Sequence, residues 1–155
     1  PRGEVVGPLG VGLWRPELAD RAQRFGEYAR YNTCLPSVLS ELAILVVARF
    51  WGSEFEWYSH KQIALAAGIS PKVVETIRVG GVPSLEESDQ TIVYEFSRTL
   101  LEQRSVDDEL YSRTIAALGE AAVIDLVGIL GYYSFISLTI NVFRVPLPDG
   151  IESEL

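Results

Sequence analysis

The sequence is poor in the residues that build metal and redox centres. It has one cysteine, Cys34, and one histidine, His60, among 155 residues. A single cysteine can form neither an intrachain disulfide nor a cysteine-rich metal site, and a single histidine excludes sites that need several imidazoles. No acidic loop has the ligand spacing of a calcium site. We therefore expect no metal and no cofactor, and we expect Cys34 to be a small buried side chain.

Positive charge is also scarce. Lys and Arg number 13 against 21 Asp and Glu, which gives a formal net charge of -8, and the basic residues are scattered singly. A phosphate backbone or an anionic membrane repels such a chain. We expect neither nucleic acid nor membrane as a partner. The first residues lack a basic segment followed by an apolar core, so we expect no signal peptide and a cytoplasmic location.

The pattern of apolar residues predicts an all-α protein, because apolar positions recur at helical spacing and sustained alternation is missing. Residues 1–16 are rich in glycine and proline and are predicted to form an irregular N-terminal arm. Residues 17–145 are expected to form one helical domain of about six to seven helices. Residues 146–155 should be an extended tail, since its prolines exclude a helix. The expected helices span about 17–31, 36–50, 53–67, 72–79, 84–100, 105–118 and 120–143.

Local signals mark several of these helix ends. Ser53 with Glu56 three residues later, and Ser84 with Glu87, each have the spacing of a capping box. Gly68 is expected to terminate the helix that contains His60, as a left-handed residue.

Two of the expected helices, 42–50 and 126–143, are apolar on nearly every face. The second carries no formal charge and reaches the lower edge of membrane-span length, but its polar and glycine residues favour a buried helix. One domain of this size cannot easily surround both helices, so we expect a homo-oligomer. Trp51, Trp57 and Tyr132 are candidates for interface anchors, with ordinary core packing as the alternative.

Three residues form the candidate acid–base group. His60 follows Glu56 by four residues, so the two side chains share a helix face, and imidazole transfers protons near neutral pH. Glu41 lies in an otherwise apolar run, where a carboxylate needs a partner. The structural alternatives are a histidine that simply bonds Glu56, a capping role for Glu56, and a macrodipole role for Glu41. Tyr133 and Asn141 lie about two turns apart on the last helix and are predicted to line a pocket or to bond neighbouring helices.

The chain resembles the carboxymuconolactone decarboxylase-like family, within the alkyl hydroperoxidase D-like (AhpD-like) superfamily, over roughly residues 18 to 148. The resemblance is carried by Glu41-Leu42-Ala43-Ile44-Leu45, Glu56-Trp57, His60, Ala67-Gly68-Ile69-Ser70, Gly131-Tyr132-Tyr133, Asn141 and Pro146-Leu147-Pro148. It implies an all-α AhpD-like domain assembled as a homo-oligomer, for example a dimer, trimer or hexamer.

The resemblance also separates two branches of the superfamily. The peroxidase branch uses a Cys-x-x-Cys pair, and the matching positions here hold Ser53 and Glu56. Because neither side chain can act as a redox thiolate, we expect no thiol peroxidase. In the decarboxylase branch, the resemblance implies that His60 is the general acid and that Glu41 tunes or reloads it.

The remaining assignments follow from that branch. Trp57, Tyr133, Asn141 and Arg49 are the predicted substrate-binding residues, with Glu56 beside the acid. A carboxylated lactone normally needs a cationic partner, for which Lys61 and Arg30 are further candidates.

The sequence therefore predicts a cofactor-free acid–base lyase or isomerase on a small carboxylated or lactone-type metabolite, in aromatic compound catabolism. The alternatives are a hydrolase or proton-transfer enzyme in which Glu56 activates water, and a catalytically silent oligomer that binds a small molecule.

Overall fold

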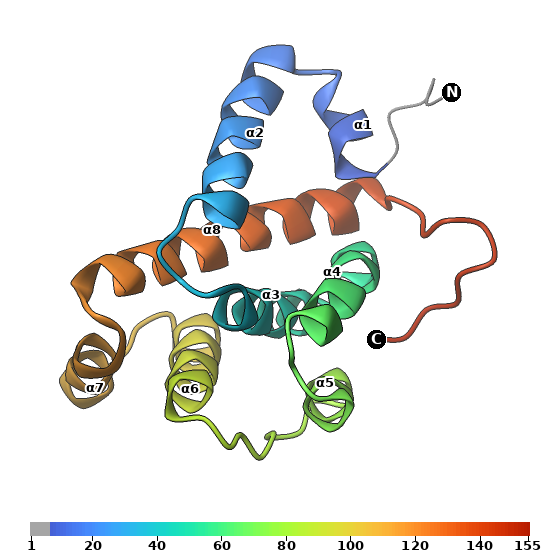
Figure 1. The fold of residues 1–155 in the computed structure, drawn as a ribbon. Coiled ribbons are helices and arrows are strands. Elements are labelled where there is room, and N and C mark those ends of the chain that lie inside the picture. The colour runs from blue at the N-terminus through green and yellow to red at the C-terminus, as the bar shows by residue number, and fades with distance from the viewer. Residues whose placement is uncertain (1–6) are drawn as a thin grey trace.

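The computed structural model describes residues 7–155, and within them every regular element is an α-helix (Figure 1). The eight helices are α1 (Pro8–Gly12), α2 (Pro16–Tyr31), α3 (Ser37–Trp51), α4 (Glu54–Ala66), α5 (Pro71–Arg78), α6 (Ser88–Gln103), α7 (Asp108–Leu118) and α8 (Glu120–Phe143). The prediction of an all-α fold is confirmed. The helix count exceeds the expected one because residues 8–12, predicted to belong to an irregular arm, form α1, where Pro8 occupies the first helical turn. Residues 1–6 of that arm lie outside the described part.

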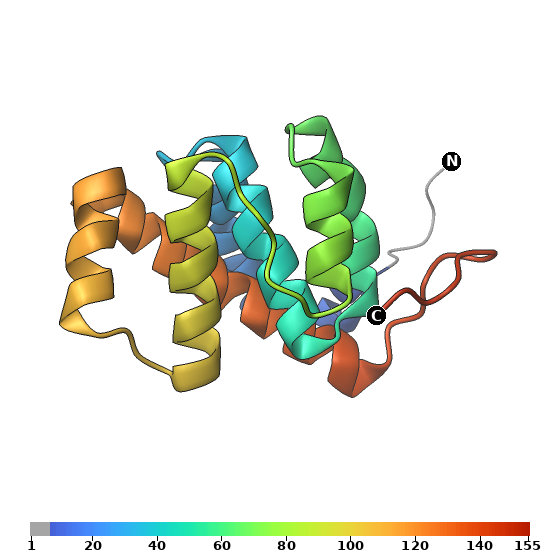
Figure 2. The same ribbon diagram turned by 90° about the horizontal axis from the view of Figure 1, so that it is seen from below.

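Helix α3 is the centre of the domain. It packs against α4, α5, α6 and α8, and its residues from Leu39 to Ala48 are all buried. In the view from below, α3 lies between α6 and α4 and in front of α8 (Figure 2). Most of the apolar run, Leu42 to Ala48, is thus buried within one protomer, whereas Phe50 at its end is exposed.

Helix α8 crosses the domain and separates α1 and α2 from the other helices (Figure 1). Among the described residues it is the one helix long and apolar enough to span a membrane, but its buried face packs on α3, as in core helices of globular domains. Its other face leaves an apolar stripe exposed, made of Ile124, Val127, Phe135, Leu138 and Val142.

Helix α2 is fixed to α8 by polar contacts as well as by packing. The Tyr28 hydroxyl donates to Asp125 Oδ1 at 2.9 Å, and the Cys34 backbone N–H donates to Asp125 Oδ2 at 2.8 Å. Cys34 itself is exposed, which corrects the expected burial. Cys34 lies in the loop between α2 and α3, and Asp125 of α8 holds this loop through the Cys34 backbone, so burial of the thiol is not required to fix it.

The predicted helix ends are partly right. Gly68 has a left-handed φ of 106° just after α4, as expected. Neither predicted capping box forms: Ser53 makes no side-chain cap bond, and α6 begins only at Ser88, after Glu87. The stretch before α6 stays irregular because Leu85 packs against the core instead of starting a helix.

Candidate active site

The site is built on a buried pair that joins two adjacent helices. His60 on α4 and Glu41 on α3 are 2.8 Å apart, from Nδ1 to Oε2, and their side chains are 5% and 7% exposed. A carboxylate can only accept here, so the proton of a neutral imidazole lies on Nδ1. Nε2 is then the free nitrogen of His60. Glu41 is a partner that orients the ring, as its apolar surroundings in the sequence indicated.

Glu56 lies on the other side of the same imidazole. Its Oε2 is 3.5 Å from His60 Nε2, and that oxygen is buried with no hydrogen-bond partner among the described residues. Burial raises the pKa of Glu56 above its usual range, and the opposing effects of His60 and Arg30 only partly offset this. The side chain points to His60 rather than back to the helix start, which explains the missing capping box.

Two tyrosines of α8 complete this region. The Tyr133 ring meets His60 edge-on, with centroids 4.9 Å apart, and Tyr132 meets Tyr133 edge-on at 5.2 Å. Burial raises the pKa of Tyr133 well above its usual value, so its phenol stays a neutral donor. Tyr132 reaches across to α2, where Gly26 leaves room for it: a Cβ at that position would lie 2.2 Å from the Tyr132 hydroxyl oxygen.

These groups open onto a large cleft between α1, α2, α4 and α8. Its volume is about 800 Å³, within the range of small-molecule sites. His60, Glu56 and Tyr133 line its inner end, whereas Glu41 lies behind His60 and does not line it. Most of the remaining wall is apolar or aromatic: Pro8, Val11, Trp14, Leu18, Ala19, Ala22, Phe55, Tyr132, Phe135, Ile136 and Phe143.

Two arginines bring positive charge to this apolar cleft. Arg15 and Arg30 both line it, and neither forms an ion pair within the described residues. The Arg30 guanidinium lies 5.3 Å from the Tyr31 ring centroid. Its charge opposes the effect of burial, which raises the pKa of Tyr132. Among the described residues we find no group of side chains suited to hold a metal ion.

Three of the residues predicted to bind substrate lie elsewhere. Trp57 is buried and its indole N–H donates to Glu154 Oε2 at 3.0 Å, on the side of α4 away from the cleft. The Asn141 side chain donates to the Trp51 carbonyl at 2.7 Å and so joins α8 to the end of α3. Arg49 lines a separate pocket of about 90 Å³ between α3 and α6. None of these three lines the cleft, because each sits on a helix face turned to the core or to another helix.

Some residues line the cleft although the sequence analysis did not assign them to the substrate site. Of the three cations named from the sequence, Arg30 lines the cleft, whereas Arg49 does not and Lys61 is paired with Glu154. Arg15, which also lines the cleft, was not named. Tyr132, a candidate interface anchor, faces α2 and the cleft. The small residues Ala22 and Gly26, four apart before Arg30, were the available sequence signal for a helix face that approaches another element closely.

The comparisons with known proteins concern the fold. No family model matches the chain, and no curated protein matches it. The crystal structure of an uncharacterized peroxidase-related protein from Silicibacter sp. TM1040 superposes with a TM-score of 0.77. The match covers 91% of this chain and 75% of that one, at 11% sequence identity. The chain has the AhpD-like fold. At this identity the likeness shows the fold and says nothing of a shared reaction.

Proposed function

We propose that the protein is a cofactor-free acid–base enzyme of the carboxymuconolactone decarboxylase-like kind, a lyase or isomerase acting on a carboxylate with an apolar body. One observation carries the proposal: Glu41 holds the His60 ring through Nδ1, which directs Nε2 to the cleft beside the buried, unbonded Glu56. A histidine that merely satisfied itself in the core would not face a cleft of this size.

The chemistry that this arrangement supports is proton transfer to or from carbon. In the decarboxylase form of the reaction, the bond from the substrate carbon to its carboxylate breaks and its electron pair moves into a conjugated carbonyl, as an enolate. Tyr133 and protonated Glu56 are neutral donors that stabilise the enolate oxygen. Protonated His60, with Glu41 as its counter-ion, delivers a proton from Nε2 to carbon, and solvent then restores it. Carbon dioxide and the protonated product leave.

The cleft indicates the kind of molecule that is bound. Arg30 and Arg15 suit the binding of a carboxylate, and the mostly apolar wall suits a ring or chain longer than a compact lactone. Placing the carboxylate at Arg30 leaves the apolar body along α1 and α2. The substrate class we propose is therefore a monocarboxylate or carboxylated lactone with an apolar substituent.

The alternatives receive less support. A thiol peroxidase lacks its redox cysteines, since Ser53 and Glu56 stand at the matching positions and Cys34 lies in the α2–α3 loop. A hydrolase in which Glu56 activates water needs that carboxylate ionised, and burial favours its protonated form. A silent binding protein has no use for an oriented imidazole at the inner end of the cleft.

The test is a turnover assay on γ-carboxymuconolactone and on carboxylated butenolides that carry increasing apolar substituents. We expect the substituted compounds to be better substrates, and His60→Ala to lower kcat by about two orders of magnitude or more. The matched control is Glu86→Gln, which removes an exposed carboxylate that does not line the cleft. Equal turnover by wild type and His60→Ala contradicts the proposal.

We also infer that the protein self-associates in solution through the apolar stripe of α8. Ile124 and Val142 are 66% and 69% exposed at the two ends of the stripe, which is long for a surface that stays in water. A second copy offers the same surface, as homo-oligomers do. Light scattering after size exclusion measures the mass, and Leu138→Glu in the middle of the stripe should lower it to that of one chain.

A further inference from the structure

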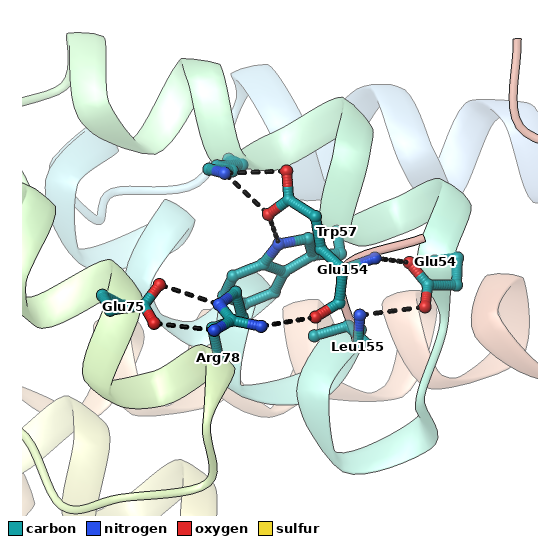
Figure 3. Close-up of polar contacts among 7 residues, drawn as sticks. Glu54, Trp57, Glu75, Arg78, Glu154 and Leu155 are labelled. Carbon is teal, nitrogen blue, oxygen red and sulfur yellow. Dashed lines mark hydrogen bonds and ion pairs between the residues drawn. The ribbon is translucent and has the colours of Figure 1, made fainter. Parts of the chain in front are cut away.

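The chain segment Ser153–Leu155, here named the strap, returns to the outer side of α4 and α5. It lies across the start of α4 and the end of α5, as the close-up shows (Figure 3). Leu155 is partly buried against the hydrophobic core, so the strap adheres by packing as well as by polar bonds. All its polar contacts are made with side chains of α4 and α5.

Three positions of α4 hold the strap. Glu54, the first residue of the helix, accepts the backbone N–H groups of Glu154 at 3.0 Å and Leu155 at 2.9 Å, and also the Ser153 hydroxyl. One turn on, the Trp57 indole N–H donates to Glu154 at 3.0 Å. Positions 54, 57 and 61 recur at helical spacing, so the contacts follow one face of α4.

The third position and α5 complete the contact. Lys61 Nζ lies 2.6 and 2.8 Å from the two Glu154 carboxylate oxygens. From α5, Arg78 donates to the Glu154 backbone carbonyl at 2.7 Å while its other nitrogens bond Glu75. The hydrogen bonds from Lys61 and Trp57 lower the pKa of Glu154 below its usual range. Glu154 therefore joins two helices that otherwise share few contacts.

The bonded positions alternate along α4 with the residues of the candidate site. Glu56 directly precedes Trp57, and His60 directly precedes Lys61. Each of these two strap-binding residues of α4 therefore follows a residue that lines the cleft. The helix is also flanked by glycines in the left-handed region, Gly52 with φ 57° and Gly68 with φ 106°. Such residues tolerate a change in direction of the chain, so the orientation of α4 is set by its packing on α3 and by the contacts that the strap adds.

We propose that Glu154 is a positioning residue for the acid–base site: through Trp57 and Lys61 it holds α4 in the orientation that places His60 against Glu41 and Glu56. The expected effect on turnover rests on the proposed function, whereas the positioning of α4 rests on the contacts of the strap alone. Loss of the Glu154 carboxylate leaves the Trp57 N–H buried without a partner and frees Lys61. The strap then detaches and α4 gains freedom relative to α3.

The single histidine makes the test direct, because His60 gives one imidazole signal by NMR without assignment of others. We expect Glu154→Ala to shift and broaden the His60 Cε1–H signal and to speed amide exchange of α4 residues 56–60 by about tenfold, with α6 and α8 unchanged. Glu154→Gln, whose amide oxygen can still accept from Trp57, should show a smaller effect. Glu152→Ala is the matched control, since this neighbouring carboxylate is exposed and makes no contact among the strap bonds.

Two results overturn the proposal. One is faster exchange confined to residues 150–155, with the His60 signal and α4 as in the wild type. The other is equal acceleration in all helices, which means a general loss of stability rather than positioning. Because neither readout needs a substrate, the positioning role stands or falls independently of turnover. Where turnover is measured, Glu154→Ala should lower kcat with little change in KM.

Discussion

Replacing Gly26 with alanine tests how closely α2 approaches α8 at the cleft. In most helix interiors this change is favourable, because alanine stabilises a helix by about 1 kcal/mol relative to glycine. Here the new Cβ would lie 2.2 Å from the Tyr132 hydroxyl oxygen and 2.4 Å from its ring carbon Cζ. Tyr132 must then swing out of its contacts with Phe25 and Tyr133, whose ring centroids lie 5.4 and 5.2 Å away.

A matched variant isolates the clash. Gly131→Ala is also a glycine replacement inside a helix, but within one protomer no atom outside its own stretch of helix lies within 4 Å of its new Cβ. Both variants share the gain in helix propensity, so the difference between them measures overpacking, about 1–3 kcal/mol in favour of Gly131→Ala. Urea unfolding followed by circular dichroism, at one protein concentration, gives both free energies.

A double variant checks the cause. In a Tyr132→Ala background the obstacle is gone, and Gly26→Ala should stabilise the protein by about 1 kcal/mol, as propensity alone predicts. If Gly26→Ala is as stabilising as Gly131→Ala in the wild-type background, α2 and α8 lie further apart than described and the reasoning is wrong.

Three further changes have definite expected outcomes. Glu41→Gln keeps the shape of the His60 partner but removes its charge, so kcat should fall about tenfold with an unchanged circular dichroism spectrum; full activity contradicts this. Burial raises the pKa of Glu56, so the folded protein holds this proton more tightly than the unfolded chain does. The resulting contribution to the free energy of unfolding is complete below the unfolded pKa of about 4.3, and it falls as pH rises toward the folded pKa. Urea curves between about pH 4 and 8 should show Glu56→Gln gaining stability over wild type as pH rises, and a constant difference is the opposing result. Asp125→Ala removes the acceptor for Tyr28 and for the loop backbone, and should lower the free energy of unfolding by about 2–3 kcal/mol; a loss under about 0.5 kcal/mol shows that these bonds matter little.

Helix identity and the contact between Glu41 and His60 could be predicted from the sequence because each has a local signal. Gly68, just after α4, has the left-handed conformation that its residue type predicted, and α7 begins at Asp108, close to the predicted start at about 105. The meeting of Glu41 and His60 follows from the cost of burying a carboxylate without a partner. Both are properties of a few neighbouring residues.

The rest of the site depends on how helices are rotated against each other, which spacing does not give. Trp57 was expected in the pocket because it directly follows Glu56, and Asn141 because it lies about two turns from Tyr133 on the last helix. Each lies on a face that contacts another segment, the strap for Trp57 and the end of α3 for Asn141. The walls made by α1 and α2 were missed, because a glycine- and proline-rich start gave no sign that residues 8–12 form a helix beside the cleft.

The cleft is built from two separate stretches of the chain. The groups that we propose for proton transfer come from α3, α4 and α8, whereas α1 and α2, between residues 8 and 31, supply Arg30 and much of the apolar wall. Substitutions in that first stretch can change which molecule is admitted while the imidazole and its carboxylates stay untouched. Exchange of residues 8–25 for another sequence would therefore alter the apolar wall of the cleft and leave in place the groups that we propose for proton transfer.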